Sequence, residues 1–137
     1  MVAEFLKNIM YIDMLIDTKI QQINDIRNRM CYVGISYGDK VQGSKDPDKF
    51  TNGVAKIIEL EEVIDADIDK LVDMKSQARE MIETLERNVD KVILYKRYFE
   101  RKGFDQIANE LNYSKRRIEQ LHSDAICTLE KRFGFFR

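Results

Sequence analysis

Residues 103–123, GFDQIANELNYSKRRIEQLHS, have the pattern of two helices joined by a tight turn. In the first helix the apolar residues recur at helical spacing on one face: Phe104, Ile107, Ala108 and Leu111. Ser114 follows the turn, and its hydroxyl can accept a hydrogen bond from a backbone N–H that the first turn of a helix leaves unpaired. The stretch therefore predicts a helix, a turn at Asn112 and Tyr113, and a second helix from Ser114.

The second helix of this stretch is predicted to have distinct inward and outward faces. Its inward residues are expected to be Ile118, Leu121, Ala125 and Leu129. Its outward residues are expected to be Lys115, Arg116, Glu119, Gln120 and Ser123. Two helices joined by a turn of this length form the helix-turn-helix, whose second helix lies in the major groove of DNA. A helical hairpin in a protein-binding bundle is the alternative that the pattern leaves open.

Charge is distributed unevenly along the chain. Residues 1–86 carry 11 Lys and Arg against 17 Asp and Glu, a balance of −6, whereas residues 87–137 carry 12 against 7, a balance of +5. The formal net charge of −1 conceals this difference. A basic C-terminal module on an acidic helical body is expected of a DNA-binding domain with a separate partner-binding region. The predicted domains are accordingly 1–86 and 87–137.

Composition argues against several other classes of protein. The chain of 137 residues contains one proline and six glycines, so long helices with few breaks are expected. No apolar run approaches the ~18 residues that a membrane-spanning helix needs, and the first residues do not have the pattern of a secretory signal. The two cysteines, Cys31 and Cys127, show no ligand spacing and are expected to be free thiols in a reducing cytoplasm.

A long helix is predicted at the start of the chain, over residues 3–33. Its apolar residues alternate spacings of three and four, the heptad pattern of a helix that packs against another helix. Lys19 occupies the one polar position of this seam. The predicted seam consists of Ile9, Ile12, Ile16, Ile23, Ile26, Met30 and Val33, and it is widened by Leu6, Leu15 and Ile20.

Residues 34–46 are rich in glycine, serine and aspartate and are predicted to form a loop. The proline that follows suits the first turn of a second long helix, predicted over 47–86. Glu61 and Lys75 interrupt the heptad seam of this helix. The predicted seam consists of Phe50, Val54, Ile57, Ile64, Ile68, Leu71, Ala78, Ile82 and Leu85.

The short connection favours folding of the two long helices into an antiparallel hairpin. The charged interruptions Lys19, Glu61 and Lys75 are expected to fix its register or orientation at some cost in stability. Apolar residues beside the seams, Leu60 and Met74 among them, leave more apolar surface than two helices cover, so a homodimer through the hairpin is predicted. The many carboxylates of the second helix form either a solvated face or a docking surface for a basic partner.

A third helix is predicted over residues 89–101, with Asn88 as its cap and Gly103 beyond its end. This helix would brace the other two and complete a three-helix DNA-binding module. Lys131 and Arg132 end the last helix favourably for its dipole. The apolar tail that follows, FGFF at residues 133–136, is expected to fold onto a core or a second subunit.

The segment VILYKRYFERKGFDQIANELNYSKRRIEQLHSDAICTLEKRF resembles the helix-turn-helix of sigma-factor region four, the module that reads the −35 promoter element. The resemblance covers about the last 45 residues and implies a helix-turn-helix fold. The matching residues are Arg97-Tyr98-Phe99-Glu100, Ile107-Ala108, Leu111, Ser114, Arg117-Ile118, Gln120 and Ala125 to Leu129. More widely, the hairpin, the segments DKVQGSKD and AKIIELE, and this module resemble small phage and prophage proteins related to the ArpU/RinA-like transcriptional regulators.

The resemblance implies a sequence-specific regulator of phage or prophage genes that acts on the nucleoid in the cytoplasm of a bacterial host. By analogy with sigma factors, Lys115, Arg116, Gln120 and Glu119 would face base edges, while Arg117 would meet a phosphate. Glu119 departs from the basic residue that sigma factors usually carry there, so the promoter sequence does not transfer to this chain. Other sigma domains are also missing from the chain, which is therefore not expected to replace a sigma factor.

The residues predicted to bind DNA are Ser114, Lys115, Arg116, Arg117, Glu119, Gln120 and Ser123. No catalytic residue, metal ligand or cofactor is predicted, because the sequence has one histidine, no glycine-rich phosphate loop and no metal-ligand spacing. The single His122 is expected to lie near a phosphate or to pack at the turn, and the chain is not expected to be an enzyme.

The sequence therefore predicts an all-α DNA-binding transcriptional regulator, with a long antiparallel helical hairpin followed by a three-helix module. The predicted partners are double-stranded DNA, a second copy of the chain, and RNA polymerase or another transcription protein, without a membrane. Two alternatives remain. One is a small terminase-type DNA-packaging protein, which also joins a helix-turn-helix to a helical oligomerisation core. The other is a helical interaction protein that does not bind DNA.

Overall fold

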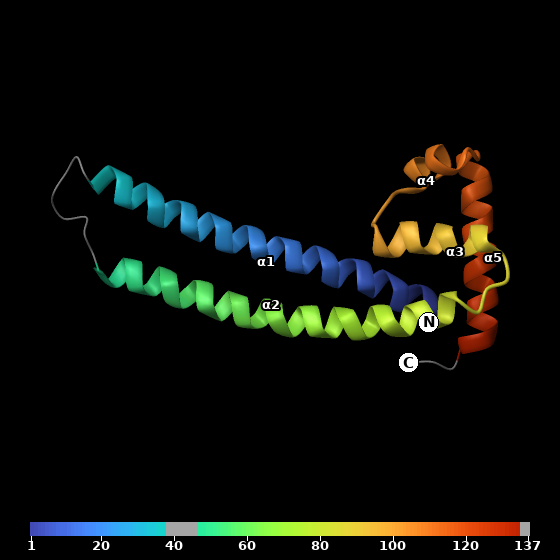
Figure 1. Cartoon of the computed structure of the whole chain (residues 1–137), viewed down its shortest axis with the longest axis horizontal. Helices are drawn as coiled ribbons and strands as arrows, with labels where there is room; N and C mark the ends of the chain where they lie inside the picture. Colours follow the sequence, from blue (N-terminus) through green and yellow to red (C-terminus); the bar gives the residue numbers. More distant parts are fainter. Residues whose placement is uncertain (38–46, 135–137) are drawn as a thin grey trace. The chain divides into compact units, whose positions relative to one another are not determined.

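The computed structural model describes residues 1–37 and 47–134, with the backbone alone described for 31–37 and 47–49. The regular structure of these residues is entirely helical, which confirms the prediction of an all-α chain (Figure 1). The elements are α1 (Val2–Tyr37), α2 (Pro47–Ile82), α3 (Asn88–Leu94), the π-helix η1 (Tyr95–Phe99), α4 (Phe104–Leu111) and α5 (Lys115–Phe133).

The chain forms two compact units whose limits differ from the predicted domains. Unit 1 comprises Met1–Asp13 and Leu71–Arg137, and unit 2 comprises Met14–Lys70. The first residues of the chain join unit 1 because their apolar side chains are fully buried: Val2, Leu6 and Ile9. A boundary at residues 86 and 87 stays a prediction about which fragment folds independently.

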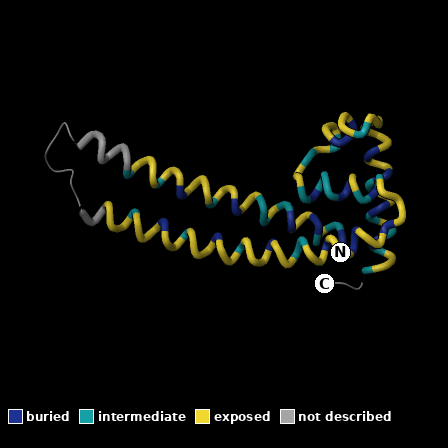
Figure 2. Tube along the Cα trace, viewed as in Figure 1, coloured by how far each residue is buried: buried dark blue, intermediate teal, exposed yellow. Residues whose placement is uncertain are grey.

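The core of unit 1 that positions the candidate site is built from α3, α4 and α5. Its buried members are Ile93, Ile107, Ala108, Ile118 and Leu121, with Val89, Phe104 and Leu111 packed against them. Each helix contributes residues at spacings of three or four, so each turns one apolar face to the other two. Figure 2 shows buried segments on all three helices. Burial of these side chains fixes how α5 is held by α3 and α4.

The predicted helix over 89–101 is broken into two elements. After α3 the backbone widens into η1, in which the N–H of Glu100 donates to the carbonyl of Tyr95, 3.1 Å away and five residues back. A π-turn contains one residue more than an α-turn, so it rotates the side chains that follow it. Tyr98 is thereby buried at 2% exposure, while the Phe99 ring lies beside Lys75 Nζ, 5.4 Å from its centroid.

Two helix ends in unit 1 also differ from the sequence interpretation. Asn88 is the first residue of α3 rather than its cap, and the start of that helix has no side-chain cap. Helix α2 ends at Ile82 rather than at residue 86. There the Thr84 hydroxyl donates to the carbonyl of Met81 at 2.7 Å, a local side-chain bond of the kind that competes with continuation of a helix.

In unit 2, α1 and α2 run antiparallel to one another. Lys19 Nζ lies 2.6 Å from Asp67 Oδ2, and Arg27 Nη2 lies 3.5 Å from Glu61 Oε2, so later residues of α1 meet earlier residues of α2. The buried isoleucines of this pair recur every seven residues: Ile16 and Ile23 on α1, Ile57 and Ile64 on α2. The charged interruptions Lys19 and Glu61 thus each have an opposite charge on the facing helix.

The seam of α2 differs from the predicted one by one row of residues. Three predicted seam residues are exposed: Phe50 at 60%, Val54 at 37% and Ile68 at 40%. The row that faces α1 instead contains Gly53, Leu60, Asp67 and Met74, all of intermediate burial. This choice has two physical causes. Gly53 leaves room for Met30, whose sulfur lies 2.9 Å from where a Cβ of residue 53 would be, and Asp67 pairs with Lys19.

Several predicted features fall at the limits of the described residues. Residues 34–37 of the predicted loop belong to α1, and residues 38–46 lie outside the described part of the chain. In the C-terminal tail Phe133 ends α5 and is partly buried, whereas the prediction for Phe135 and Phe136 lies outside the described residues.

Candidate nucleic-acid interface

The turn between α4 and α5 is defined by three residues with different backbone roles. Asn112 adopts the left-handed conformation, with φ 61° and ψ 39°, which asparagine tolerates better than most residues. The N–H of Tyr113 donates to the carbonyl of Ala108 at 3.0 Å, as in a Schellman motif that ends a helix. Ser114 returns to an extended conformation, with φ −74° and ψ 154°. The chain thus reverses between the two helices within a few residues.

Ser114 caps α5 in the way its position predicts. Its hydroxyl oxygen accepts a hydrogen bond from the N–H of Arg117 at 3.1 Å. A serine at this position stabilises a helix by about 1 kcal/mol relative to alanine. Because the cap fixes the first turn of α5, it also fixes the backbone from which Lys115, Arg116 and Arg117 project.

Helix α5 has the inward face that its sequence predicts. Ile118 and Leu129 are fully buried, and Leu121 and Ala125 are exposed by 2% and 1%. Ala108 of α4 is also buried, at 5% exposure, and its small side chain lets the two helices approach closely. The phase of α5 about its axis is therefore set by packing, which leaves the opposite face to solvent.

All seven residues predicted to bind DNA are exposed: Ser114, Lys115, Arg116, Arg117, Glu119, Gln120 and Ser123. Spacings of four and three place Arg116, Gln120 and Ser123 in one line along the exposed face of α5. Arg117 Nη1 donates to Gln120 Oε1 at 3.2 Å, and Lys115 Nζ lies 3.5 Å from Asp105 Oδ1 of α4. The structure thus brings the predicted residues together over the first turns of α5.

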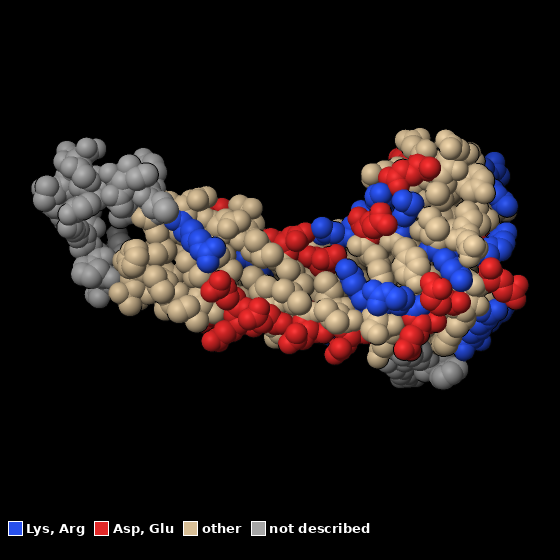
Figure 3. All heavy atoms as spheres, in the orientation of Figure 1, with Lys and Arg blue, Asp and Glu red and all other residues tan. Residues whose placement is uncertain are grey.

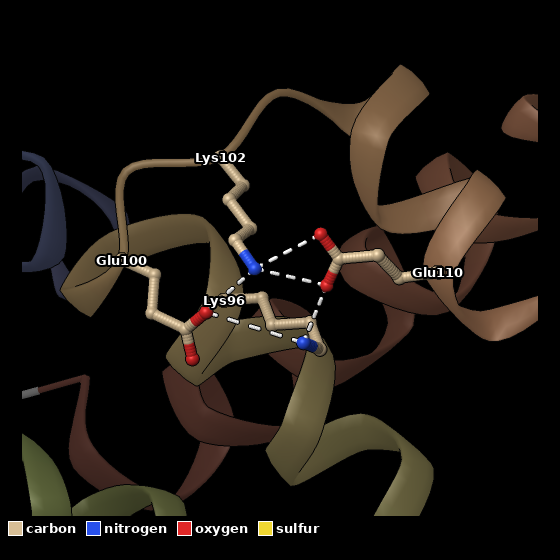
Figure 4. Close-up of polar contacts among 4 residues, drawn as sticks. All are labelled: Lys96, Glu100, Lys102 and Glu110. Atoms are coloured by element: carbon tan, nitrogen blue, oxygen red, sulfur yellow. Dashed lines mark hydrogen bonds and ion pairs between the residues drawn. The ribbon is translucent and has the colours of Figure 1, made fainter.

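Two lysines of unit 1 outside α5 are neutralised by carboxylates. Lys96 and Lys102 both contact Glu110 of α4, at 2.6 Å and 2.9 Å, and Lys102 also lies 2.9 Å from Glu100 (Figure 4). Hydrogen bonds from Lys96 and then Lys102 lower the pKa of Glu110 to about 2. This four-residue cluster ties α4 to the segment after α3, and it leaves little positive charge for another partner.

Three further basic side chains before α4 also have partners within the fold. Arg87 Nε pairs with Asp90 at 3.1 Å, and Lys91 Nζ pairs with Glu83 at 3.4 Å. Arg97 lies over the Phe104 ring, 4.5 Å from its centroid, a cation–π contact that further anchors α4. These residues add to the count of basic residues in the sequence, but in the folded chain each one contacts an acidic or aromatic side chain.

Within residues 87–134, exposed positive charge without an acidic partner is therefore concentrated on α5. Among the described residues, no carboxylate pairs with Arg116, Arg117 or Lys131. Lys and Arg atoms lie along α5 in the space-filling view (Figure 3). Lys131 is predicted from the sequence to interact favourably with the helix dipole. It also lies eleven residues after Gln120, which puts it on the same exposed face of α5.

His122 packs inside unit 1 rather than on the exposed face. Its Nε2 lies 2.7 Å from Tyr98 Oη, and its ring meets the Phe104 ring edge-on with centroids 5.0 Å apart. Burial, together with the positive charges of Arg97 and Lys7, lowers the pKa of His122 to about 4. The imidazole is neutral at pH 7, and it packs against η1 and the start of α4 rather than against the turn.

Glu130 has a structural role that its place in the sequence does not predict. Its Oε1 accepts hydrogen bonds from the N–H groups of Val2 at 2.7 Å and Ala3 at 3.4 Å, so α5 caps the first turn of α1. These contacts join residues almost the whole chain apart, and no local sequence pattern reports them. The N-terminal segment is thus bound to the helix that carries the candidate interface.

The described residues contain no group of three metal-ligating side chains and no helix with the length and apolar character to cross a membrane. Comparison with protein families, with curated proteins and with solved structures finds no match to this chain. The resemblance to sigma-factor region four and to the ArpU/RinA-like regulators therefore stays a prediction.

Proposed function

We propose that this chain is a sequence-specific DNA-binding regulator of transcription, with the first turns of α5 inserted in the major groove. The observation that carries the proposal is the concentration of exposed positive charge at the start of α5, directly after a capped, tight turn. Phosphate contacts supply most of the affinity of DNA-binding proteins, and the second helix of a helix-turn-helix contacts bases through its N-terminal residues.

The exposed face of α5 offers the two kinds of contact that such a complex needs. Arg116 and Gln120 carry side chains that can form paired hydrogen bonds with guanine and adenine edges. Lys115, Arg117 and Lys131 are suited to phosphates, which fix the position of the helix without reading sequence. Glu119 can accept a hydrogen bond from the amino group of cytosine and would repel a nearby phosphate.

A matched pair of triple variants tests the proposal. Lys115→Ala, Arg116→Ala and Arg117→Ala together remove three positive charges from the candidate interface. Arg29→Ala, Lys56→Ala and Lys70→Ala together remove the same charge from exposed positions of α1 and α2. Binding is measured by fluorescence anisotropy on duplex DNA over a series of salt concentrations.

We expect only the first triple variant to lose DNA affinity. The slope of its log affinity against log salt should fall by about 0.9 for each phosphate contact removed. If both triple variants bind DNA as the parent does, α5 is not the DNA-binding helix. Absence of salt-dependent binding by the parent would favour the helical interaction protein instead.

The role in transcription and the phage or prophage context rest on the resemblance alone. They imply a protein bound to the nucleoid of a bacterial host, with RNA polymerase or another transcription protein as a second partner. The terminase-type alternative predicts a ring of many subunits, whereas a regulator is expected to be a monomer or a dimer. The mass of the parent in solution distinguishes these two functions.

A further inference from the structure

One face of the helix pair in unit 2, beside the buried seam, carries exposed apolar side chains and a pair of opposite charges. The ion pair Arg27–Glu61 lies beside the buried seam, with side chains exposed by 56% and 51%. One heptad away along each helix are Ile20 and Ile68, exposed by 43% and 40%. Val54, seven residues before Glu61 on α2, adds a third exposed apolar side chain at 37%.

These residues lie on one side of the helix pair because of the antiparallel register. Positions seven apart return to almost the same side of a helix, so Ile20 shares the side of Arg27, and Ile68 shares the side of Glu61. Because Lys19 contacts Asp67, the neighbouring residues Ile20 on α1 and Ile68 on α2 lie at the same height along the helix pair. The face therefore has one level, or height along the helices, with two isoleucines, and a second level with Arg27 and Glu61.

We infer that this face, named here the Ile20–Glu61 face, binds a second copy of the same chain. The inferred dimer has its two-fold axis parallel to the helices, so that α1 of one copy lies on α2 of the other. Each Arg27 then meets the other copy's Glu61, and each Ile20 meets the other copy's Ile68. At both levels the two-fold rotation brings complementary side chains of the two copies together, as a two-fold interface requires.

Complementarity favours a second copy over a different partner. The described residues of unit 2 offer no third helix to cover the flanks of the pair, and four antiparallel helices form a closed bundle in which each apolar row is shared. A two-fold axis across the helices at the charged level would instead oppose two copies of Arg27 and two of Glu61. The inference is independent of DNA binding, since it involves no residue of α4 or α5.

The test uses the full chain and two single variants, Arg27→Glu and Glu61→Arg. Either change places like charges opposite one another twice in the dimer, so each variant alone should dissociate at least about tenfold more readily than the parent. In an equimolar mixture, a chain with two carboxylates at the charged level can pair with a chain that has two guanidinium groups there. Dimers should therefore return in the mixture. Mass is measured by sedimentation equilibrium against the chain mass of 16.2 kDa.

An apolar pair of variants separates the interface from general effects on the fold. Ile68→Lys should give a monomer, whereas Val63→Lys should stay dimeric, because Val63 is similarly exposed at 45% but projects from the opposite flank of α2. Circular dichroism establishes that each variant remains helical. A monomeric parent, or single charge variants that dimerise as the parent does, would overturn the inference, as would a mixture that stays monomeric.

Discussion

The α4–α5 region and the α1–α2 pair of unit 2 solve the problem of burying an apolar helix face in different ways. In the first, three helices enclose a core in which Ile107 and Ile118 are fully buried. In the second, two helices cover only one row of isoleucines and leave Ile20 and Ile68 exposed. One region is closed on itself, whereas the other has apolar surface left over.

Charge follows the same division. The closed region turns basic side chains of α5 outward, while α2 displays a row of acidic side chains that is visible in the space-filling view (Figure 3). A helix whose phase is fixed by a closed core can hold a recognition face in one orientation. A helix pair with one open flank is instead suited to association. We therefore propose ligand binding for the first region and self-association for the second.

The largest expected effect concerns how far the closed region depends on the first residues of the chain. A fragment of residues 87–137 lacks Val2, Leu6 and Ile9, which are fully buried in unit 1. Each such side chain stabilises the fold by about 1.5–3 kcal/mol, and a small domain has only ~5–15 kcal/mol in total. The fragment should therefore be largely unfolded by circular dichroism. A cooperative melt like that of the full chain would instead support the boundary at residues 86 and 87.

A substitution in each region compares the two kinds of core. Ile118→Ala should lower the free energy of unfolding by about 2–5 kcal/mol, because the closed core cannot easily collapse around the cavity. Ile64→Ala should cost less, since a two-helix seam is more open to water and can adjust. Exposed Ile58→Ala is the control, with an expected change within about 0.5 kcal/mol. Urea unfolding that gives Ile118→Ala and the control the same midpoint would show that the phase of α5 is wrong.

A smaller effect on the stability of the fold is expected from a change of pH. The pKa of His122 falls from 6.5 to about 4 on folding, so between these values the unfolded chain binds more protons than the folded one. Stability should therefore be full above pH 6.5 and decline as the pH falls towards 4. His122→Gln should flatten this dependence between pH 7 and 5, a range above the usual pKa of carboxylates. Equal slopes for parent and variant in urea unfolding would mean that His122 is not buried in its neutral form.

Local patterns in the sequence predict the α4–α5 region well. The spacing of Ile107, Ala108 and Ile118 indicates the buried faces, and Ser114 has the residue type and position of a helix cap. These features depend on residues close together in the chain. The same reasoning predicts α1 and α2 as long helices, because their heptad spacing is sustained over many turns.

Features that depend on contacts between residues far apart in the sequence cannot be predicted from local patterns. Apolar character favours the row of Val54 and Ile68 as the α2 seam, yet contacts of Gly53 with Met30 and of Asp67 with Lys19 select the neighbouring row. The cap that Glu130 provides for α1 and the pairing of Glu110 with two lysines are likewise long-range or three-dimensional. Counting basic residues therefore overstates the positive charge available outside α5.

We propose that the exposed start of α5 reads DNA without holding the fold. The most direct measurement first selects genomic fragments that the parent retains, and then compares the parent with Arg116→Ala on a selected and a scrambled duplex. We expect the variant to lose about 1–3 kcal/mol of binding to the selected duplex, with its free energy of unfolding changed by no more than about 0.5 kcal/mol. An unchanged preference for the selected duplex would contradict base reading by Arg116, and selection of no fragment by the parent would contradict the claim as a whole.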